Sequence, residues 1–434
     1  MATDLNRVAP IRLRRRVAIA IVTLVVVAIA APFGVTAYSK SRWNDFWNRH
    51  QCSQAEFDLD PGIRKPICAT QHESNAWEFY AKSSLAMPVQ EYIAASESLR
   101  ALLQLIIKRA STRKDFEELR AVLERLDPVV KCFQEGAGCE RAVFQHFCWG
   151  EGTVAGSYAW TGADMDAELL CNTAMGRLFL KQTALSFKDM TTCLQYGRDV
   201  ASVQTFLALR NGLDAIDSAL FIALVILTFS ESEFPEAASL GTVLENLDRQ
   251  FPSLHRTIKG EVTMLFADIV QSIPGNWSGP PPRRLHSWKH AFSIPLTVAA
   301  LYDIAAREVE AARTWESSEW TSVVSKHSAF DRALEKDLWR VSRAKWYPVE
   351  EIELRWRESR ARLRLVQAAA RYRHGGSTEV TDLPTDPFTL KPLHFRKESG
   401  RILFWSEWKD GDDNGTGDWL PKGSRQDLVV ELRD

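Results

Sequence analysis

The longest apolar run in the chain extends from Val17 to Tyr38 and directly follows a basic segment, RLRRR, at residues 12–16. A helix rises about 1.5 Å per residue, so about 20 apolar residues cross a hydrocarbon core of roughly 30 Å. Because basic residues before a span stay on the cytoplasmic side, the pattern predicts a transmembrane helix with a cytoplasmic N-terminus. Membrane lipid is then a partner through residues 17–38, and the rest of the chain is exported.

A removable signal peptide is the alternative interpretation of this run. Ala28-Ile29-Ala30 matches the small-residue pattern that precedes a cleavage site. The apolar run continues beyond it through residues 31–37, which favours an anchor that is not cleaved. Either interpretation predicts export, and we expect a protein of the bacterial inner membrane whose bulk lies in the periplasm or outside the cell.

Between residues 76 and 272, apolar residues recur at spacings of three and four, which is typical of amphipathic helices. Leu99, Leu102 and Leu103 belong to one such set, and a second set ends at Asp127-Pro128, where we expect the helix to stop. Several helices with short connections predict a domain of antiparallel helical hairpins. The apolar stretch at 219–229 is too short to cross a membrane and predicts a buried core helix.

A loop rich in proline and glycine at 273–282 marks the start of a second helical segment. A long helix follows from Val349 to Tyr372, with arginines and glutamates at spacings that allow ion pairs. We interpret this helix as presenting a solvated charged face. A basic docking surface is the alternative.

The chain changes character after His374, where turn residues alternate with short apolar runs. Leu393–Arg396, Ile402–Ser406 and Leu428–Leu432 are predicted strands, and the first two are expected to be joined by a turn at Lys397–Gly400. The fold class is therefore mainly α, with an N-terminal transmembrane helix, a helical-hairpin domain and a small C-terminal α+β module with an antiparallel sheet. The expected segments are a cytoplasmic basic tail (1–16), the transmembrane helix (17–38), a juxtamembrane segment (39–75), a helical domain (76–272), a second helical segment (273–345), and the long helix with its sheet (346–434).

The composition bears on nucleic-acid binding and on disulfide formation. The 54 Lys and Arg balance the 55 Asp and Glu, so no excess of positive charge favours nucleic acid as a partner. All seven cysteines fall between Cys52 and Cys193, and export would permit disulfides. Cys52/Cys68 and Cys132/Cys139 are candidate pairs that are near in sequence, but spacing does not fix the connectivity. Small buried thiols are the alternative.

The strongest local motif is an acidic, glycine-rich loop in the tail, DGDDNGTGD at 410–418. Oxygen ligands at alternate positions, followed by a glycine that permits a sharp turn, suit a calcium ion. Pro421 stands where a calcium loop of the EF-hand type has its closing glutamate. A solvated hairpin tip is therefore the alternative to a calcium site. The predicted metal ligands are Asp410, Asp412, Asn414, Thr416 and Asp418.

The tail also carries a family resemblance. A long helix, the segment DPFTLKPL at 386–393, a strand that ends at Trp405-Ser406, and the acidic loop together resemble the C-terminal sheet of type II secretion major pseudopilins. The tail resembles still more that of uncharacterised bacterial membrane-anchored helical proteins, which also have an N-terminal anchor and a long helical middle. In pseudopilins the acidic loop binds calcium, which the resemblance transfers to Asp410, Asp412 and Asp418. The resemblance covers only the tail, and the apolar run lacks the glutamate that pseudopilins carry there.

Catalytic signatures are absent from the sequence: it contains no GxSxG, HExxH, GxxxxGK[ST] or helix-opening GxGxxG motif. We therefore expect a single-pass envelope protein whose exported helical domain binds or scaffolds a partner, such as another envelope protein. An exported hydrolase-like enzyme without a recognisable motif is one alternative. An accessory component of a secretion or pilus-like system is the other.

Overall fold

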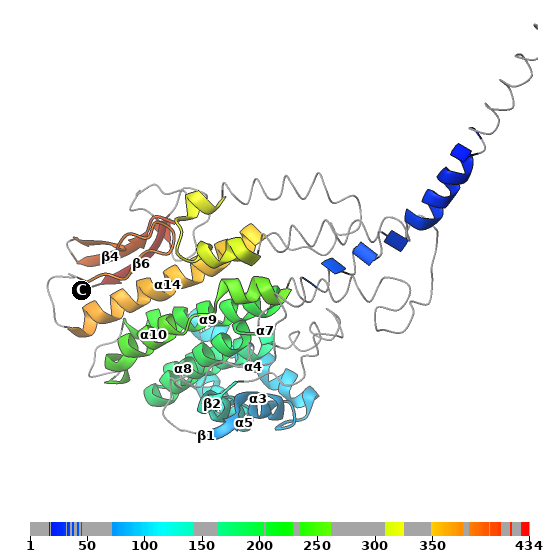
Figure 1. Ribbon diagram of the computed structural model, residues 1–434. Coiled ribbons are helices and arrows are strands. Elements are labelled where there is room, and N and C mark those ends of the chain that lie inside the picture. The colour runs from blue at the N-terminus through cyan, green and yellow to red at the C-terminus, as the bar shows by residue number, and fades with distance from the viewer. Residues whose placement is uncertain are drawn as a thin grey trace, which may run out of the picture.

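The computed structural model describes most of the helical middle and the tail of the chain (Figure 1). The described residues are Val17, 19–31, 33–34, 37–38, 41–42, 45, 72–142, 163–203, 205–228, 235–261, 309–324, 349–375, 382–398, 400–408, 417–418 and 427–433. The protein is mainly helical with a small sheet near its C-terminus. The predicted fold class is confirmed at this level.

Residues 19–31 of the predicted anchor are helical. Across the described residues, no helix combines the length and apolar character that crossing a membrane requires. The transmembrane helix expected over 17–38 stays a prediction.

The helical middle is built from packed hairpins, as the spacing of apolar residues predicts. Contacts join α4 to α5, α7 to α8, and α8 to α9. The apolar positions at Leu99, Leu102 and Leu103 are buried, because they lie on the face of α4 that packs on its neighbours. The helices of this region are α3 (Ala76–Ser83), α4 (Val89–Ile107), α5 (Arg113–Ala137), α7 (Ala163–Phe179), α8 (Thr183–Ala201), α9 (Phe206–Ile226) and α10 (Leu240–Arg249).

The predicted helix end at Asp127-Pro128 is wrong, because α5 continues through Pro128 to Ala137. Proline removes one helical hydrogen bond and normally bends or ends a helix. In α5, Val130 and Phe133 lie in the turns after Pro128 and are buried. The burial of these side chains offsets the cost of the proline.

A short parallel sheet that the sequence did not predict lies beside these hairpins. β1 (His72–Asn75) pairs with β2 (Cys139–Arg141). Its first strand falls in the segment expected to be irregular, 39–75. Asn75 then caps α3, since its side chain accepts a hydrogen bond from the backbone N–H of Trp77.

The long charged helix α14 (Val349–Gly375) lies between the hairpins and the C-terminal sheet (Figure 1). It contacts α9 and α10 on one side and strands β4 and β6 on the other. Glu353, Arg357 and Arg362 are buried. The interpretation of this helix as a solvated charged face is therefore wrong, because its charges pair with neighbouring elements.

The C-terminal sheet has the strand order β3-β4-β6-β5. Its strands are β3 (His394–Glu398), β4 (Arg401–Ser406), β5 (Gly417–Asp418) and β6 (Asp427–Arg433). The first three in spatial order are antiparallel, as predicted, whereas β5 runs parallel to β6 and was not predicted. The turn between β3 and β4 is shorter than expected, and Gly400 in it has a φ of +78°, which a glycine adopts without strain.

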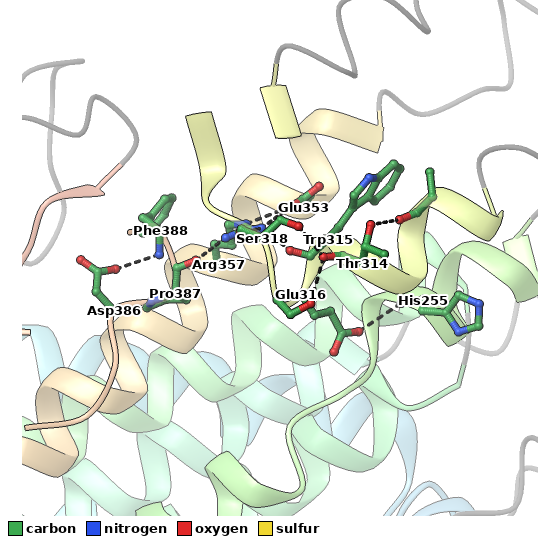
Figure 2. A network of polar contacts seen from close by, with 12 residues as sticks. His255, Thr314, Trp315, Glu316, Ser318, Glu353, Arg357, Asp386, Pro387 and Phe388 are labelled. Atoms are coloured by element: carbon green, nitrogen blue, oxygen red, sulfur yellow. Dashed lines mark hydrogen bonds and ion pairs between the residues drawn. The ribbon is translucent and has the colours of Figure 1, made fainter. Parts of the chain in front are cut away.

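One arginine of α14 connects three parts of the chain (Figure 2). The Arg357 Nη2 group donates to the carbonyls of Trp315, at 2.6 Å, and Ser318, at 2.9 Å. Its Nη1 group donates to the carbonyl of Pro387. The guanidinium thus ties the segment 309–324 and the start of the tail to α14.

Candidate functional site

A groove of about 870 Å³ lies between α4, α7, α9 and α14. This volume is within the range of about 300–1,000 Å³ that is usual for small-molecule sites. The groove brings together residues from Arg100 to Arg362. Its walls are thus contributed by helices that lie far apart in the sequence.

One wall of the groove is apolar. Leu103 and Ile107 come from α4, Met175 from α7, and Phe221 and Ile222 from α9. Ile107 is 63% exposed and Phe221 is 48% exposed. Because large apolar side chains are rarely left half-exposed side by side without a reason, this wall is a candidate binding surface.

The charged part of the lining, which we call the charged wall, comes from α9 and α14. Asp217 Oδ2 accepts from Arg362 Nη1 at 2.5 Å and lies 3.1 Å from Arg355 Nη2. Arg355 also donates to Asp214. Although burial opposes its charge, the carboxylates of Asp217 and Asp214 raise the pKa of Arg355. The two arginines are therefore neutralised by the aspartates of the adjacent helix.

Asp217 keeps one oxygen without a partner. Its Oδ1 atom is buried and makes no hydrogen bond within the described part of the chain. A buried acceptor of this kind is costly unless a donor reaches it. Because this atom is enclosed, the arginines that pair with Oδ2 are what offset the charge of the carboxylate.

Asp164 stands at the edge of the groove, in the first turn of α7. Partial burial, and then the nearby carboxylate of Asp214, raise its pKa, while Arg210 acts in the opposite direction. Among the described residues it forms no ion pair within contact distance. Both effects disfavour its negative charge in the empty groove, and a cation beside it would relieve them.

A bidentate ion pair closes the outer rim of the groove between α4 and α7. Arg100 Nε donates to Glu168 Oε1 at 2.7 Å, and Arg100 Nη2 donates to Glu168 Oε2 at 2.6 Å. Both side chains are about half exposed. An exposed pair of this kind contributes about 0–1 kcal/mol, so it orders the rim more than it stabilises the fold.

A second cluster of charged groups lies in the core of the hairpins and is enclosed. Asp199 accepts from the hydroxyl of Tyr80 at 2.8 Å and from Arg198 at 2.6 Å. Asp189 pairs with Arg177 at 2.8 Å. Burial raises the pKa of Asp189 to about 6, even though Arg177 opposes that rise. These groups pair with one another inside the core, so we assign them to the stability of the fold.

The predicted calcium ligands are not brought together by any described contact. Asp410, Asp412, Asn414 and Thr416 lie outside the described residues. Asp418 is in β5, where its backbone pairs with Leu428. In the part of the chain that the structure describes, no group of three or more His, Cys, Asp or Glu is placed to hold a metal ion.

The four described cysteines, Cys132, Cys139, Cys171 and Cys193, are not joined by disulfides in the structure. The sulfurs of Cys132 and Cys139 instead approach backbone carbonyls four residues earlier, at 3.4 Å each. These two are therefore not joined, contrary to one of the pairings that the spacing suggested. Cys52, Cys68 and Cys148 lie outside the described residues.

Sequence reasoning missed the groove, although its charged wall left a detectable signal. Asp214 and Asp217 are three apart, and Arg355 and Arg362 are seven apart, so each pair lies on one helix face. The two helices carry opposite charges on those faces. That complementarity could have predicted that α9 packs on α14, but not that α4 and α7 complete the groove.

No protein-family model matches this chain, and no curated protein or solved structure matches it either. The resemblance of the tail to pseudopilins therefore stays a prediction. The groove between α4, α7, α9 and α14 is therefore the feature that bears on function.

Proposed function

We propose that this chain is a membrane-anchored envelope protein whose exported helical domain binds a small amphipathic ligand in the groove between α4, α7, α9 and α14. The observation that carries the proposal is the mixed lining of the groove. Ile107 and Phe221 are exposed apolar side chains, and charged side chains of α9 and α14 line the same groove.

The apolar wall supplies binding energy. Fully burying an Ile or Phe side chain is worth about 1.5–3 kcal/mol, and here roughly half of each remains to be covered. Covering both gives on the order of 2 kcal/mol, less the cost of fixing the ligand. This suits a weak or moderate binder with an apolar body.

The charged edge selects the head group of the ligand. Arg355 and Arg362 already pair with Asp214 and Asp217, so the groove offers an anion little uncompensated positive charge. Asp164 forms no such pair among the described residues, and its carboxylate is destabilised by partial burial and then by Asp214. A primary amine on the ligand would therefore be favoured over a carboxylate of the same shape.

Binding is favoured over catalysis by the way the polar groups are used. Catalytic sites present convergent groups that are free to act on a substrate. Here the arginines and aspartates of the charged wall pair across the interface of α9 and α14. These ion pairs stabilise the packing of α9 on α14 and leave the side chains unable to act on a substrate.

The anchor and the calcium loop complete the proposal. The apolar run at 17–38 behind the basic segment 12–16 supports a single membrane crossing with the bulk of the chain exported. The oxygen ligands at 410–418 support calcium as a stabiliser of the tail, as the pseudopilin resemblance also implies. Both are independent of the groove.

The groove can be tested with two probes of equal shape and opposite charge, phenylbutylamine and phenylbutanoate. The full chain in lipid discs is titrated with each, binding is followed by saturation-transfer NMR, and empty discs give the background. We expect saturable binding of the amine and weaker binding of the acid. Equal signals from loaded and empty discs would refute the proposal.

A matched pair of variants places the binding in the groove. Phe221→Ser removes an apolar side chain from the wall, and we expect it to weaken binding by about fivefold, since about 1 kcal/mol of burial is lost. Leu105→Ser removes a similarly exposed side chain of α4 that does not line the groove. This control is expected to leave binding unchanged, and an equal loss in both variants would contradict the assignment.

A further inference from the structure

The sulfurs of Cys171 and Cys193 lie 3.5 Å apart. Cys171 belongs to α7 and Cys193 to α8, two antiparallel helices joined by residues 180–182. Their separation in sequence gave no reason to pair them. Their contact arises because α7 and α8 pack along their length.

We propose that Cys171 and Cys193 form a reversible intrachain disulfide that joins α7 to α8. A disulfide has an S–S length of about 2.05 Å, so the two sulfurs must approach by roughly 1.5 Å. No other pair of described cysteine sulfurs is in contact: those of Cys132 and Cys139 face backbone carbonyls.

The two thiols differ in access, which sets the order of the reaction. Cys171 lines the groove and is partly exposed, whereas Cys193 is fully buried. The contact with Cys171 and then burial raise the pKa of the Cys193 thiol. The Cys171 sulfur is therefore the one that an oxidant in solution reaches first.

The chemistry is a pair of thiol–disulfide exchanges with a low-molecular-weight disulfide such as oxidised glutathione. The Cys171 thiolate attacks one sulfur of that disulfide, a mixed disulfide forms, and one glutathione thiolate leaves and takes up a proton. Cys193 then loses its proton to solvent, and its thiolate attacks the Cys171 sulfur and expels the second glutathione. Two protein thiols are oxidised and one glutathione disulfide is reduced.

The proposal does not depend on ligand binding in the groove, because both cysteines belong to the helix pair itself. Its consequence reaches the groove, however. Cys171 is part of the α7 wall, so the disulfide would fix that wall against α8.

Peptide mapping of the full chain in lipid discs tests the pairing. The protein is incubated with oxidised glutathione, remaining thiols are alkylated after denaturation, and the chain is cleaved after Lys, Arg and Glu. The cleavage isolates Cys171 in LLCNTAMGR (169–177) and Cys193 in DMTTCLQYGR (189–198), apart from Cys148. We expect these two peptides to appear as one cross-linked species, and to separate after reduction.

Two results would overturn the inference: Cys171 carrying glutathione while Cys193 is alkylated, or Cys171 joined to a different cysteine. Cys132→Ser is the matched control, since Cys132 is also partly exposed, and it should retain the cross-link. Cys171→Ala should abolish it and leave Cys193 as a free thiol. The wild-type map decides the question even if a variant fails to fold.

Discussion

Arg357 and Glu353 lie one turn apart on α14 and form a salt bridge in which both side chains are completely buried, with Arg357 Nη2 and Glu353 Oε1 2.7 Å apart. Removing two charges from water costs several kcal/mol each, so such a pair persists only when other hydrogen bonds complete it. The carbonyls of Trp315, Ser318 and Pro387 do so on the arginine side (Figure 2). The pair thus holds segments that are far apart in the sequence.

Substituting Arg357→Met should destabilise the protein by about 3–5 kcal/mol, because it leaves the Glu353 carboxylate buried without its cation and frees three carbonyls. Thermal melting of the full chain measures the loss. Arg313→Met is the matched control, since Arg313 pairs with Glu310 on an exposed surface. For this control we expect a change in stability of about 0–1 kcal/mol. Similar losses in the two variants would show that Arg357 does not hold these segments together.

The closest approach of α8 and α9 requires glycine. A Cβ atom added at Gly212 would lie 2.4 Å from the backbone nitrogen of Ala201 and 2.4 Å from the carbonyl oxygen of Gly197. Backbone atoms cannot rotate out of the way, so the two helices must separate. Gly212→Ala should therefore lower the melting temperature, with a loss of at least about 1–3 kcal/mol.

Gly241→Ala provides the contrast, in helix α10. An added Cβ there meets Arg371 at ordinary distances, 3.7 Å to its side chain and 4.0 Å to its backbone nitrogen. Alanine is the better helix former, so this change should be neutral or stabilise by up to about 1 kcal/mol. If Gly212→Ala also proved neutral, the tight packing of α8 on α9 would be incorrect.

The periodicity of apolar residues predicted the helical hairpins, because burial on one helix face leaves a spacing of three and four that needs no tertiary knowledge. Leu99 and Leu103 are buried for this reason. The short apolar run from Ile402 to Ser406, bounded by turn residues, likewise predicted β4, and its residues are buried. Local rules were sufficient for these elements.

The charged positions could not be predicted in the same way. Arg113 and Glu117 on α5 have the same spacing as Glu353 and Arg357 on α14, yet the first pair is exposed and the second is buried. The difference comes from what covers each helix, which local sequence does not encode. The groove was missed for the same reason, since its walls come from four helices whose packing is a tertiary property.

The stability of the hairpin core should depend on the protonation of Asp166. Burial raises the pKa of this carboxyl from its ordinary 3.8 to about 7, while a hydrogen bond from the hydroxyl of Tyr196 opposes the rise. The folded state therefore holds the proton more tightly than the unfolded state. The resulting stabilisation is complete below about pH 4 and is lost as the pH rises towards 7.

Asp166→Asn removes this titration and keeps an oxygen for Tyr196. Relative to the wild type, we expect its melting temperature to rise progressively between about pH 4 and 7 and then to level off, with roughly 4 kcal/mol as an upper limit. Glu124→Gln on the exposed surface of α5 makes the same charge change as a control. Parallel melting profiles for Asp166→Asn and the wild type would contradict a raised pKa.

Calcium should stabilise the tail if the loop at 410–418 is a binding site. Loops of this kind in extracellular modules have dissociation constants of about 10⁻⁴–10⁻³ M, so millimolar calcium should raise the melting temperature and a chelator should reverse the shift. Asp412→Asn should abolish the response. Asp382→Asn changes an exposed aspartate outside the loop and should retain it. A melting temperature that is insensitive to calcium in the wild type would favour the solvated hairpin tip.

The charge preference of the groove should depend on Asp164. Because this carboxylate has no ion pair among the described residues and is destabilised by partial burial and by Asp214, we expect it to attract the ammonium group of phenylbutylamine. Asp164→Asn should reduce the preference for the amine over phenylbutanoate by up to about fivefold, which is the scale of an exposed ion pair. The apolar contribution that both probes share should remain.

Glu124→Gln, which makes the same charge change on α5, should keep the preference for the amine. Raising the salt concentration should weaken the preference more in the wild type than in Asp164→Asn, because the wild type has one additional exposed carboxylate to screen. An unaltered preference in Asp164→Asn would mean that the selectivity arises elsewhere on the protein.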